Sequence, residues 1–146
     1  MSLKGSIKVA GDKSITHRAI IFSSLSKGTT KIHEPLLGAD CISTLEIFKQ
    51  FGVKSELSKD CLIITSPGLE SFCYDQSILD AGNSGTTARL LMGVLSNLPA
   101  TLTLIGDESL SKRPMKRVTL PLSQMGANIT LENDATFPAT ITGHQL

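Results

Sequence analysis

Residues 11–18 read Gly-Asp-Lys-Ser-Ile-Thr-His-Arg, and residues 82–89 read Gly-Asn-Ser-Gly-Thr-Thr-Ala-Arg. In both stretches a glycine and small polar residues lead into a segment of helical periodicity, and an arginine stands at the eighth position. Further on, residues 51–53 (Phe-Gly-Val) match residues 125–127 (Met-Gly-Ala) at nearly the same separation. A match that recurs in this way predicts one supersecondary unit used twice. Each copy begins with a helix N-terminus, where unpaired backbone N–H groups favour an anion.

The hydrophobic pattern predicts the elements of the first copy, residues 11–76. Ser14 is expected to cap a helix whose apolar face holds Ile15, Ala19 and Phe22. The elements expected after it are a strand at 29–33, a helix that begins at residue 38 and is closed by Gly52, and a hairpin of residues 53–57 and 61–65. Residues 7–10, in an N-terminal segment of residues 1–10, are expected to form a short strand before the first helix.

The second copy, residues 77–146, is expected to repeat this order. Its predicted elements are a strand at 77–80, a helix at 84–97 that is apolar on nearly all sides, a strand at 101–105, a loop at 106–113, a helix from Pro114 to Met125, and closing strands at 128–131 and 139–142. Both copies follow the order βαβαββ. The mixture of crossovers and hairpins predicts an α/β (α+β) fold with mixed sheets.

Composition limits the classes of function. The chain has 146 residues, 40% of them hydrophobic, and a formal net charge of +1. This length suits one ordinary core, and the charge gives no general argument for nucleic acid or a membrane surface. Neither the three cysteines nor the three histidines show metal-site or disulfide spacing. Without a signal peptide or an apolar run long enough to cross a bilayer, we expect a cytoplasmic protein that holds no metal.

The first candidate site is Lys13-Ser14 with Arg18. The helix N-terminus favours an anion, and Arg18, one turn into the helix, can reach back to bind phosphate or carboxylate with two hydrogen bonds. Lys13 adds a mobile charge. A capped helix with two solvated basic residues explains the same pattern, and the local sequence alone favours that interpretation. The stretch lacks the spacing of a Walker A loop.

The second candidate site is residues 82–87. Two glycines three positions apart allow close backbone approach, and Gly85 has no Cβ to keep an anion from its backbone N–H. Asn83 and Thr86 add polar side chains. Tight packing of the helix against a sheet explains these glycines equally well.

The third candidate site is the basic run of residues 112–117, Lys-Arg-Pro-Met-Lys-Arg. Like charges one turn apart cost stability unless an anion or an acid lies between them. A solvated basic face is the usual interpretation of such a run, although three anion-favouring features in two repeats strengthen the functional one. We expect the neighbouring Asp107 and Glu108 to pair with Lys112 or Arg113.

Together, residues 11–18, 82–86 and 113–114 resemble the 5-enolpyruvylshikimate-3-phosphate synthase (3-phosphoshikimate 1-carboxyvinyltransferase) family. The resemblance implies an inside-out α/β barrel of six βαβαββ units in two domains. This chain would hold two of the units, and its N-terminal strand would pair with the absent domain. It also implies a monomeric cytoplasmic transferase that moves the enolpyruvyl group of phosphoenolpyruvate to the 5-hydroxyl of shikimate 3-phosphate. This shikimate-pathway step leads to chorismate and the aromatic amino acids and needs no cofactor.

The resemblance also implies roles for individual residues. The expected ligands of shikimate 3-phosphate are Lys13, Ser14 and Arg18. The expected ligands of phosphoenolpyruvate are Lys13, Gly85 and Arg113, with Lys13 also catalytic and with Asn83 and Thr86 in support.

Two departures and two alternatives remain at this point. Family members are much longer, so we expect this chain to be a fragment that is inactive alone and can self-associate. Some members have Ala and Pro where this chain has Ser84 and Leu90, so the response to glyphosate stays open. One alternative is the enolpyruvyl transferase that acts on UDP-N-acetylglucosamine, although its lysine is followed by Asn rather than Ser14 and its loop usually carries a Cys absent from residues 106–113. The other is a non-catalytic anion-binding module.

Overall fold

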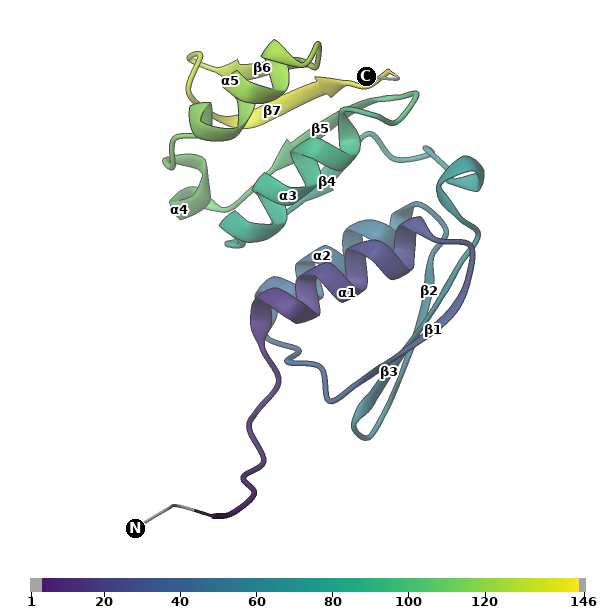
Figure 1. Ribbon diagram of the computed structural model, residues 1–146. Helices are drawn as coiled ribbons and strands as arrows, with labels where there is room; N and C mark the ends of the chain where they lie inside the picture. Colours follow the sequence, from purple (N-terminus) through teal and green to yellow (C-terminus); the bar gives the residue numbers. More distant parts are fainter. Residues whose placement is uncertain (1–3, 145–146) are drawn as a thin grey trace.

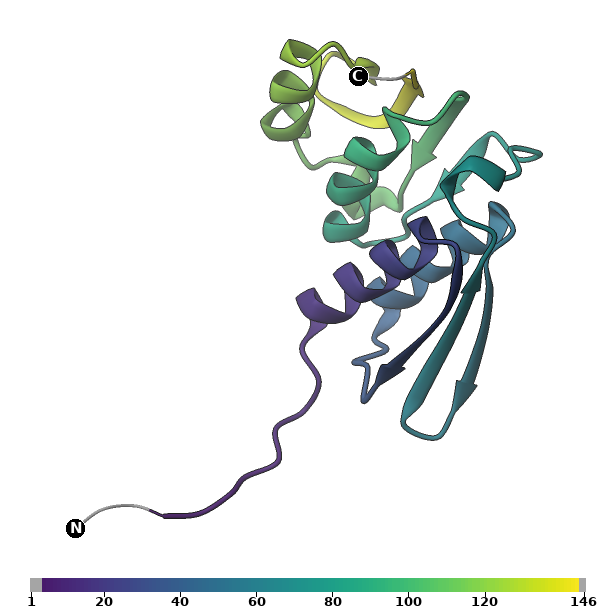
Figure 2. The same cartoon turned by 45° about the vertical axis from the view of Figure 1, so that its right-hand side comes forward.

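The computed structural model describes residues 4–144 as two layered units (Figures 1 and 2). The helices are α1 (Lys13–Leu25), α2 (Ala39–Gln50), α3 (Gly85–Leu95), α4 (Glu108–Ser111) and α5 (Lys116–Gln124), with a short 3-10 turn, η1, at Leu69–Ser71. The strands are β1 (Gly28–His33), β2 (Lys54–Ser58), β3 (Cys61–Ser66), β4 (Ile78–Asp80), β5 (Thr101–Ile105), β6 (Asn128–Glu132) and β7 (Thr136–Thr142). The mixed α/β architecture expected from the sequence is confirmed.

The two units share one strand order. The first sheet runs β1-β3-β2, and the second runs β4-β5-β7-β6, so β5, β7 and β6 take the places of β1, β3 and β2. Threonine pairs mark equivalent points across the antiparallel strands: the hydroxyl oxygens of Thr29 and Thr65 lie 3.1 Å apart, and those of Thr101 and Thr142 lie 3.2 Å apart. The repeat is therefore present in these three strands of each sheet, whereas β4 has no counterpart among residues 7–10. A division of the chain at residues 76 and 77, and the six units of a whole protein, stay predictions.

The N-terminal segment departs from the expected pattern. Residues 7–10 form no strand, and Figure 1 shows the segment extending away from both sheets. A lone extended segment gains no ladder hydrogen bonds, so it is not a stable strand without a neighbour. Pairing of this segment with residues outside the chain stays a prediction, and residues 1–3 of it lie outside the described residues.

The buried face of α1 is not the expected one. Ile15 and Phe22 are 68% and 64% exposed, whereas Ile20 and Ile21 are buried against α2 and β3. The helix has apolar side chains on more than one side, and a periodic pattern does not say which side meets a partner. The prediction that Ile15, Ala19 and Phe22 form the core face is wrong for this chain.

Three local predictions also need correction. Asp12, not Ser14, caps α1, because its Oδ1 accepts a hydrogen bond from the backbone N–H of Ile15 at 2.7 Å and the helix already begins at Lys13. The expected loop at 106–113 contains α4, which Asp107 caps in the same way. Helix α5 begins at Lys116, so Pro114 precedes it.

The core is continuous across the helices and the inner faces of both sheets. The expected alternation of Leu102 and Leu104 in β5 is confirmed, and both are buried. In α3 the residues Ala88, Leu91, Met92 and Leu95 are buried while Leu90 is 37% exposed, so this helix is buried on most sides, as expected. Helix α2 packs against α3 and joins the two units.

Candidate anion-binding site

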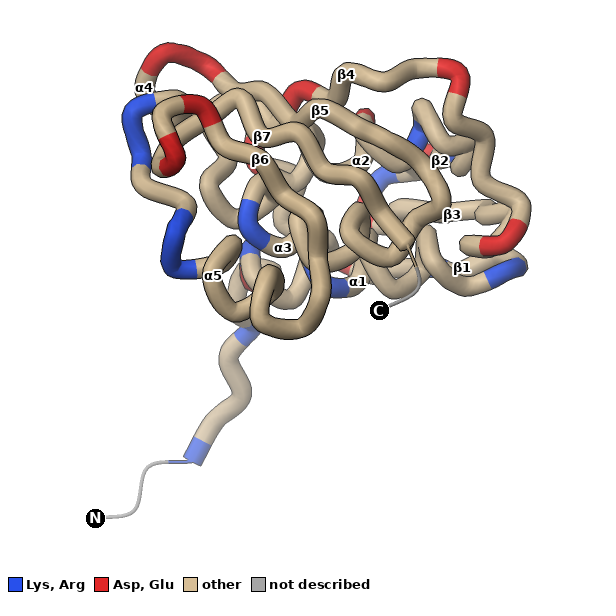
Figure 3. The backbone as a smooth tube through the Cα atoms, turned by 90° about the horizontal axis from the view of Figure 1, so that it is seen from above, with Lys and Arg blue, Asp and Glu red and all other residues tan. Residues whose placement is uncertain are grey.

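The N-terminal ends of α1, α2, α3 and α5 lie on the same side of the molecule, at the left in Figure 1. Each end presents unpaired backbone N–H groups and the positive end of a helix dipole. Figure 3 shows Lys and Arg beside α4 and near the starts of α5 and α3, with acidic residues next to them at α4. This edge of the fold therefore carries the groups that attract anions.

The first turn of α1 places its two basic side chains differently. Lys13 Nζ lies 2.8 Å from Asp40 Oδ2 at the start of α2, and this carboxylate raises the pKa of Lys13. Arg18 is exposed, and its Nη1 donates to the carbonyl oxygen of Ser14 at 3.1 Å. The guanidinium thus folds back toward the helix N-terminus, as the sequence predicts for an arginine one turn into the helix.

The first turn of α3 is tightly built. Ser84 Oγ accepts a hydrogen bond from the backbone N–H of Thr87 at 3.1 Å and caps the helix. A Cβ on Gly85 would stand 2.6 Å from Arg89 Nη1 and 3.2 Å from Arg113 Nη1. The missing side chain of Gly85 is therefore the space in which two guanidinium groups meet.

A set of hydrogen bonds holds Arg113 beside this turn. Arg113 Nη2 donates to Asn83 Oδ1 at 3.0 Å and to Ser109 Oγ at 3.3 Å. Asn83 Nδ2 in turn donates to Asp107 Oδ2 at 2.6 Å, and this hydrogen bond, with the N–H of Leu110, lowers the pKa of Asp107. Asp107 stays ionised and anchors both α4 and the amide that orients Arg113.

The structure brings the predicted residues together in two groups. Lys13, Ser14 and Arg18 lie on the exposed first turns of α1, and Asn83, Gly85 and Arg113 cluster at the start of α3. Thr86 lies half-buried beside Gly85 on the first turn of α3. Lys116 and Arg117 are exposed at the start of α5, while Lys112 pairs with Glu108 at 2.5 Å, so the expected pairing of this basic run is confirmed for one acid.

Sequence reasoning missed two residues of the site. Arg89 reaches Gly85, and Asp40 partners Lys13. The repeat itself contained the signal for Arg89, because this residue takes the place of Arg18 in the second copy. Nothing in the local sequence indicated Asp40, because its partner lies 27 residues earlier in the chain.

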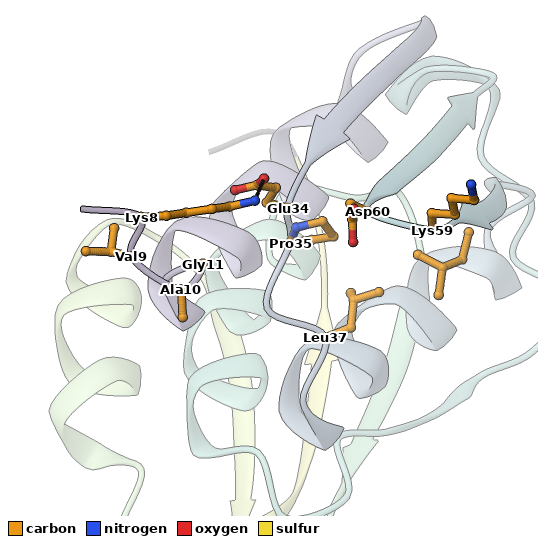
Figure 4. A pocket seen from close by; sticks show the side chains of 10 residues that line it. Lys8, Val9, Ala10, Gly11, Glu34, Pro35, Leu37, Lys59 and Asp60 are labelled. Atoms are coloured by element: carbon orange, nitrogen blue, oxygen red, sulfur yellow. Dashed lines mark ion pairs between the residues drawn. The ribbon is translucent and has the colours of Figure 1, made fainter. Parts of the chain in front are cut away.

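The surface has several hollows, and one of them is lined by Asp12 and Ile15 at the start of α1. The one shown in Figure 4 is lined by the N-terminal segment and by residues around Glu34 and Asp60. Of its two lysines, Lys8 is paired with Glu34 at 2.5 Å, and Lys59 lies next to Asp60 in the sequence. We place the candidate site at the helix N-termini because Arg18, Arg89 and Arg113 gather there beside unpaired backbone N–H groups. The open hollow along residues 107–109 and 112–114 is the one that adjoins Arg113.

Within residues 4–144 no three His, Cys, Asp or Glu side chains are arranged to hold a metal ion. None of the helices over the same range is long and apolar enough to cross a membrane.

Comparisons with known proteins identify the family of this chain. The family described as EPSP synthase (3-phosphoshikimate 1-carboxyvinyltransferase) matches residues 1–146. The chain belongs to the EPSP synthase family. It is similar to the 3-phosphoshikimate 1-carboxyvinyltransferase of Bacillus cereus (strain G9842), with 50% identity over 145 residues, 99% of this chain and 34% of the relative. The enzyme of the same name from Bacillus velezensis is 48% identical over 146 residues, again 34% of its length.

A solved structure extends the agreement to the fold. The EPSP synthase from Acinetobacter baumannii superposes with a TM-score of 0.89 at 42% identity, covering 97% of this chain and 32% of that one. The chain thus spans about a third of the length of its curated relatives.

Proposed function

We propose that the whole protein of which this sequence is a part transfers the enolpyruvyl group of phosphoenolpyruvate to the 5-hydroxyl of shikimate 3-phosphate and releases phosphate. Membership of the EPSP synthase family supports this proposal. The observation that carries it is the convergence of two arginines on the backbone of Gly85, beside a second helix N-terminus that holds Lys13 and Arg18. The chain supplies one cationic half of the substrate site.

The two helix N-termini suit the two substrates. Both substrates carry a phosphate and a carboxylate, and side by side they repel each other unless cations surround them. We assign shikimate 3-phosphate to the turn of α1, with Lys13, Ser14 and Arg18 as ligands. We assign phosphoenolpyruvate to the turn of α3, where the N–H of Gly85 and the guanidinium of Arg113 bind it, with Asn83 and Thr86 in support. Arg89 adds a further cation at the turn of α3.

Lys13 is the group that we place between the two substrates. Its ammonium is held 2.8 Å from Asp40 but is half exposed, so it can move onto a ligand. A cation at that point stabilises the negative charge that persists through the reaction, and holding both substrates together lowers the entropic cost of their encounter. This is the catalytic role that we assign to Lys13.

The chain alone is expected to be inactive, because it spans about a third of its relatives. We further propose that the whole protein is a cytoplasmic monomer whose partners are its two small substrates. The near-neutral charge of this part of the protein gives no general attraction to nucleic acid or anionic membranes. The scattered cysteines suit a reducing compartment.

A chimera tests the proposal. In it, this chain replaces the matching N-terminal third of the Bacillus cereus relative, to which it is 50% identical. Phosphate release from phosphoenolpyruvate should require shikimate 3-phosphate in the chimera and should be absent from the chain alone. A folded chimera without this activity, or one that accepts only UDP-N-acetylglucosamine, would contradict the function. Product formed by the purified chain alone would contradict the expectation that it is inactive.

A further inference from the structure

A line of polar side chains runs through the interior from α1 to α3. His17 is fully buried on α1, and its Nδ1 lies 2.8 Å from the hydroxyl of Thr44 on α2. The Thr44 hydroxyl lies 2.7 Å from that of Thr87, which lies 2.7 Å from the hydroxyl of Ser84, the cap of α3. Both ends of the line fall within the candidate site, because His17 stands between Ser14 and Arg18 and Ser84 precedes Gly85.

The surroundings of His17 select one tautomer. Its Nε2 is buried without a hydrogen-bond partner. A buried N–H without an acceptor is rarer and costlier than an unfilled lone pair, so the proton belongs on Nδ1, which donates to Thr44. Burial lowers the pKa of His17, with Lys13 and Arg18 acting in the same direction and Asp40 opposing them, so the ring is neutral at pH 7.

A donor at His17 limits where the hydroxyl protons of the line can go. Because the Thr44 oxygen accepts from His17, its proton is left for Thr87 or for the carbonyl oxygen of Asp40. The Thr87 hydroxyl has the same choice between Ser84 and Asp40, at 2.7 and 3.1 Å. Both contacts of Thr87 with α2 cross from one unit to the other. They join two units that otherwise meet chiefly through apolar packing of α2 on α3.

We propose that His17 is a positioning residue: through the hydroxyls of Thr44 and Thr87 it fixes the first turn of α3, and with it the backbone N–H of Gly85, relative to the first turn of α1. The proposal rests on the proposed function for its consequence, which is the spacing of the two substrates. It rests on geometry alone for its first step, the link from His17 to the cap of α3. Ordinary core packing would hold the helices together but would not make one cap depend on a side chain two helices away.

The first test needs no ligand. Thr44→Val keeps the shape of the side chain and removes the hydroxyl, and Thr44→Ser restores the hydroxyl as the matched control. Amide hydrogen exchange of Thr87, whose N–H is bound by the cap, should become about tenfold faster in Thr44→Val and return toward the wild-type rate in Thr44→Ser. Leu104 in β5 reports on global unfolding and should not change. Equal rates at Thr87 in all three proteins would overturn the proposal.

A second readout depends on no variant. The ring 15N shifts of His17 in the wild-type chain should show the tautomer protonated at Nδ1, whereas protonation at Nε2 would overturn the proposal. Addition of phosphoenolpyruvate should then move the His17 ring shifts in the wild type and much less in Thr44→Val. Thr44→Val could change the exchange rate at Thr87 while the wild-type spectrum does not respond to phosphoenolpyruvate. This result would support the link from His17 to the cap of α3 and count against the proposed function. Binding of phosphoenolpyruvate that leaves the ring shifts of His17 unchanged would support the proposed function and count against the link.

Discussion

Arg89 donates a hydrogen bond from Nη1 to the carbonyl oxygen of Gly85 at 3.3 Å, just as Arg18 donates to the carbonyl oxygen of Ser14 at 3.1 Å. The two arginines stand at matching positions of the repeat, each one turn into a helix. The duplication thus extends from strand order to the direction in which an arginine side chain points. The same arrangement of an arginine over a helix N-terminus serves, in our account, two different anions.

Gly85→Ala tests the part of the site at the first turn of α3, which we assign to phosphoenolpyruvate. The new methyl group would displace the guanidinium of Arg89 and press on that of Arg113, because their Nη1 atoms lie 2.6 and 3.2 Å from its position. In the chimera we expect the KM for phosphoenolpyruvate to rise at least about tenfold, as loss of a charge-assisted hydrogen bond would cause. The KM for shikimate 3-phosphate should change far less.

Gly93→Ala is the matched control. It lies on the same helix, and a Cβ there would meet nothing within 4 Å. Removing a mid-helix glycine should stabilise the chain by about 0.5–1 kcal/mol and leave both KM values unchanged. Equal effects of the two substitutions on phosphoenolpyruvate would refute the assignment of Gly85.

Lys13→Ala tests the part of the site at the first turn of α1 and the catalytic role that we assign to Lys13. The ion pair with Asp40 is half exposed on the lysine side, so its loss should change the free energy of unfolding only slightly. The kcat of the chimera should nevertheless fall by at least about a hundredfold if Lys13 stabilises the reacting charge, as removal of one such group does elsewhere. Lys112→Ala, which breaks the exposed pair with Glu108, should leave kcat unchanged, and a similar loss in both would contradict the catalytic role.

Much of the fold followed from the sequence, and the failures have physical causes. The strands of the two hairpins and the position of α3 were predictable because alternation and capping are local signals. The buried face of α1 was not, because Ile15 and Phe22 form as good an apolar stripe as the one that packs. Asp12 rather than Ser14 is the N-cap of α1, because its side chain accepts a hydrogen bond from the backbone N–H of Ile15.

The residues of the candidate site were likewise predictable only where the signal is local in the sequence. Gly85, Arg113 and Asn83 were predicted, and the structure brings them together. The link between Lys13 and Asp40, and the line from His17 to Ser84, depend on the packing of three helices, which no local pattern encodes.

Acid should weaken the fold through His17. Its pKa in the folded chain is lowered from the ordinary histidine value of 6.5, chiefly by burial, so below about pH 6.5 the unfolded chain binds more protons than the folded chain. The free energy of unfolding should therefore fall as the pH drops from 6.5 toward the lowered pKa, by at most about 1.4 kcal/mol per pH unit. Urea unfolding at pH 7.5 and 5.5 measures this.

His17→Asn supplies the comparison. An asparagine can place a polar atom near the position of Nδ1 but does not titrate. Its stability should vary less between the two pH values than that of the wild type, although carboxylates add a dependence common to both. A variant with the same pH dependence as the wild type would show that His17 is not responsible.

The exposed stripe of α1 should make the isolated chain self-associate. Ile15 and Phe22 lie on one side of the helix and are mostly exposed, so two chains gain by covering them. Phe22→Glu should lower the sedimentation coefficient at high protein concentration without loss of stability. Leu57→Glu, at a similarly exposed apolar residue on β2, is the control and should change association less. A wild-type chain that stays monomeric at every concentration would contradict this expectation.

The central claim is that this chain holds one cationic half of the substrate site, and an amide-resolved NMR titration tests it most directly. Shikimate 3-phosphate and phosphoenolpyruvate are added separately to the isolated chain. We predict saturable shifts at Lys13, Ser14 and Arg18 with the first ligand and at Gly85 and Arg113 with the second, with β2 and β3 unmoved. A well-dispersed spectrum in which neither ligand shifts either helix N-terminus would contradict the claim.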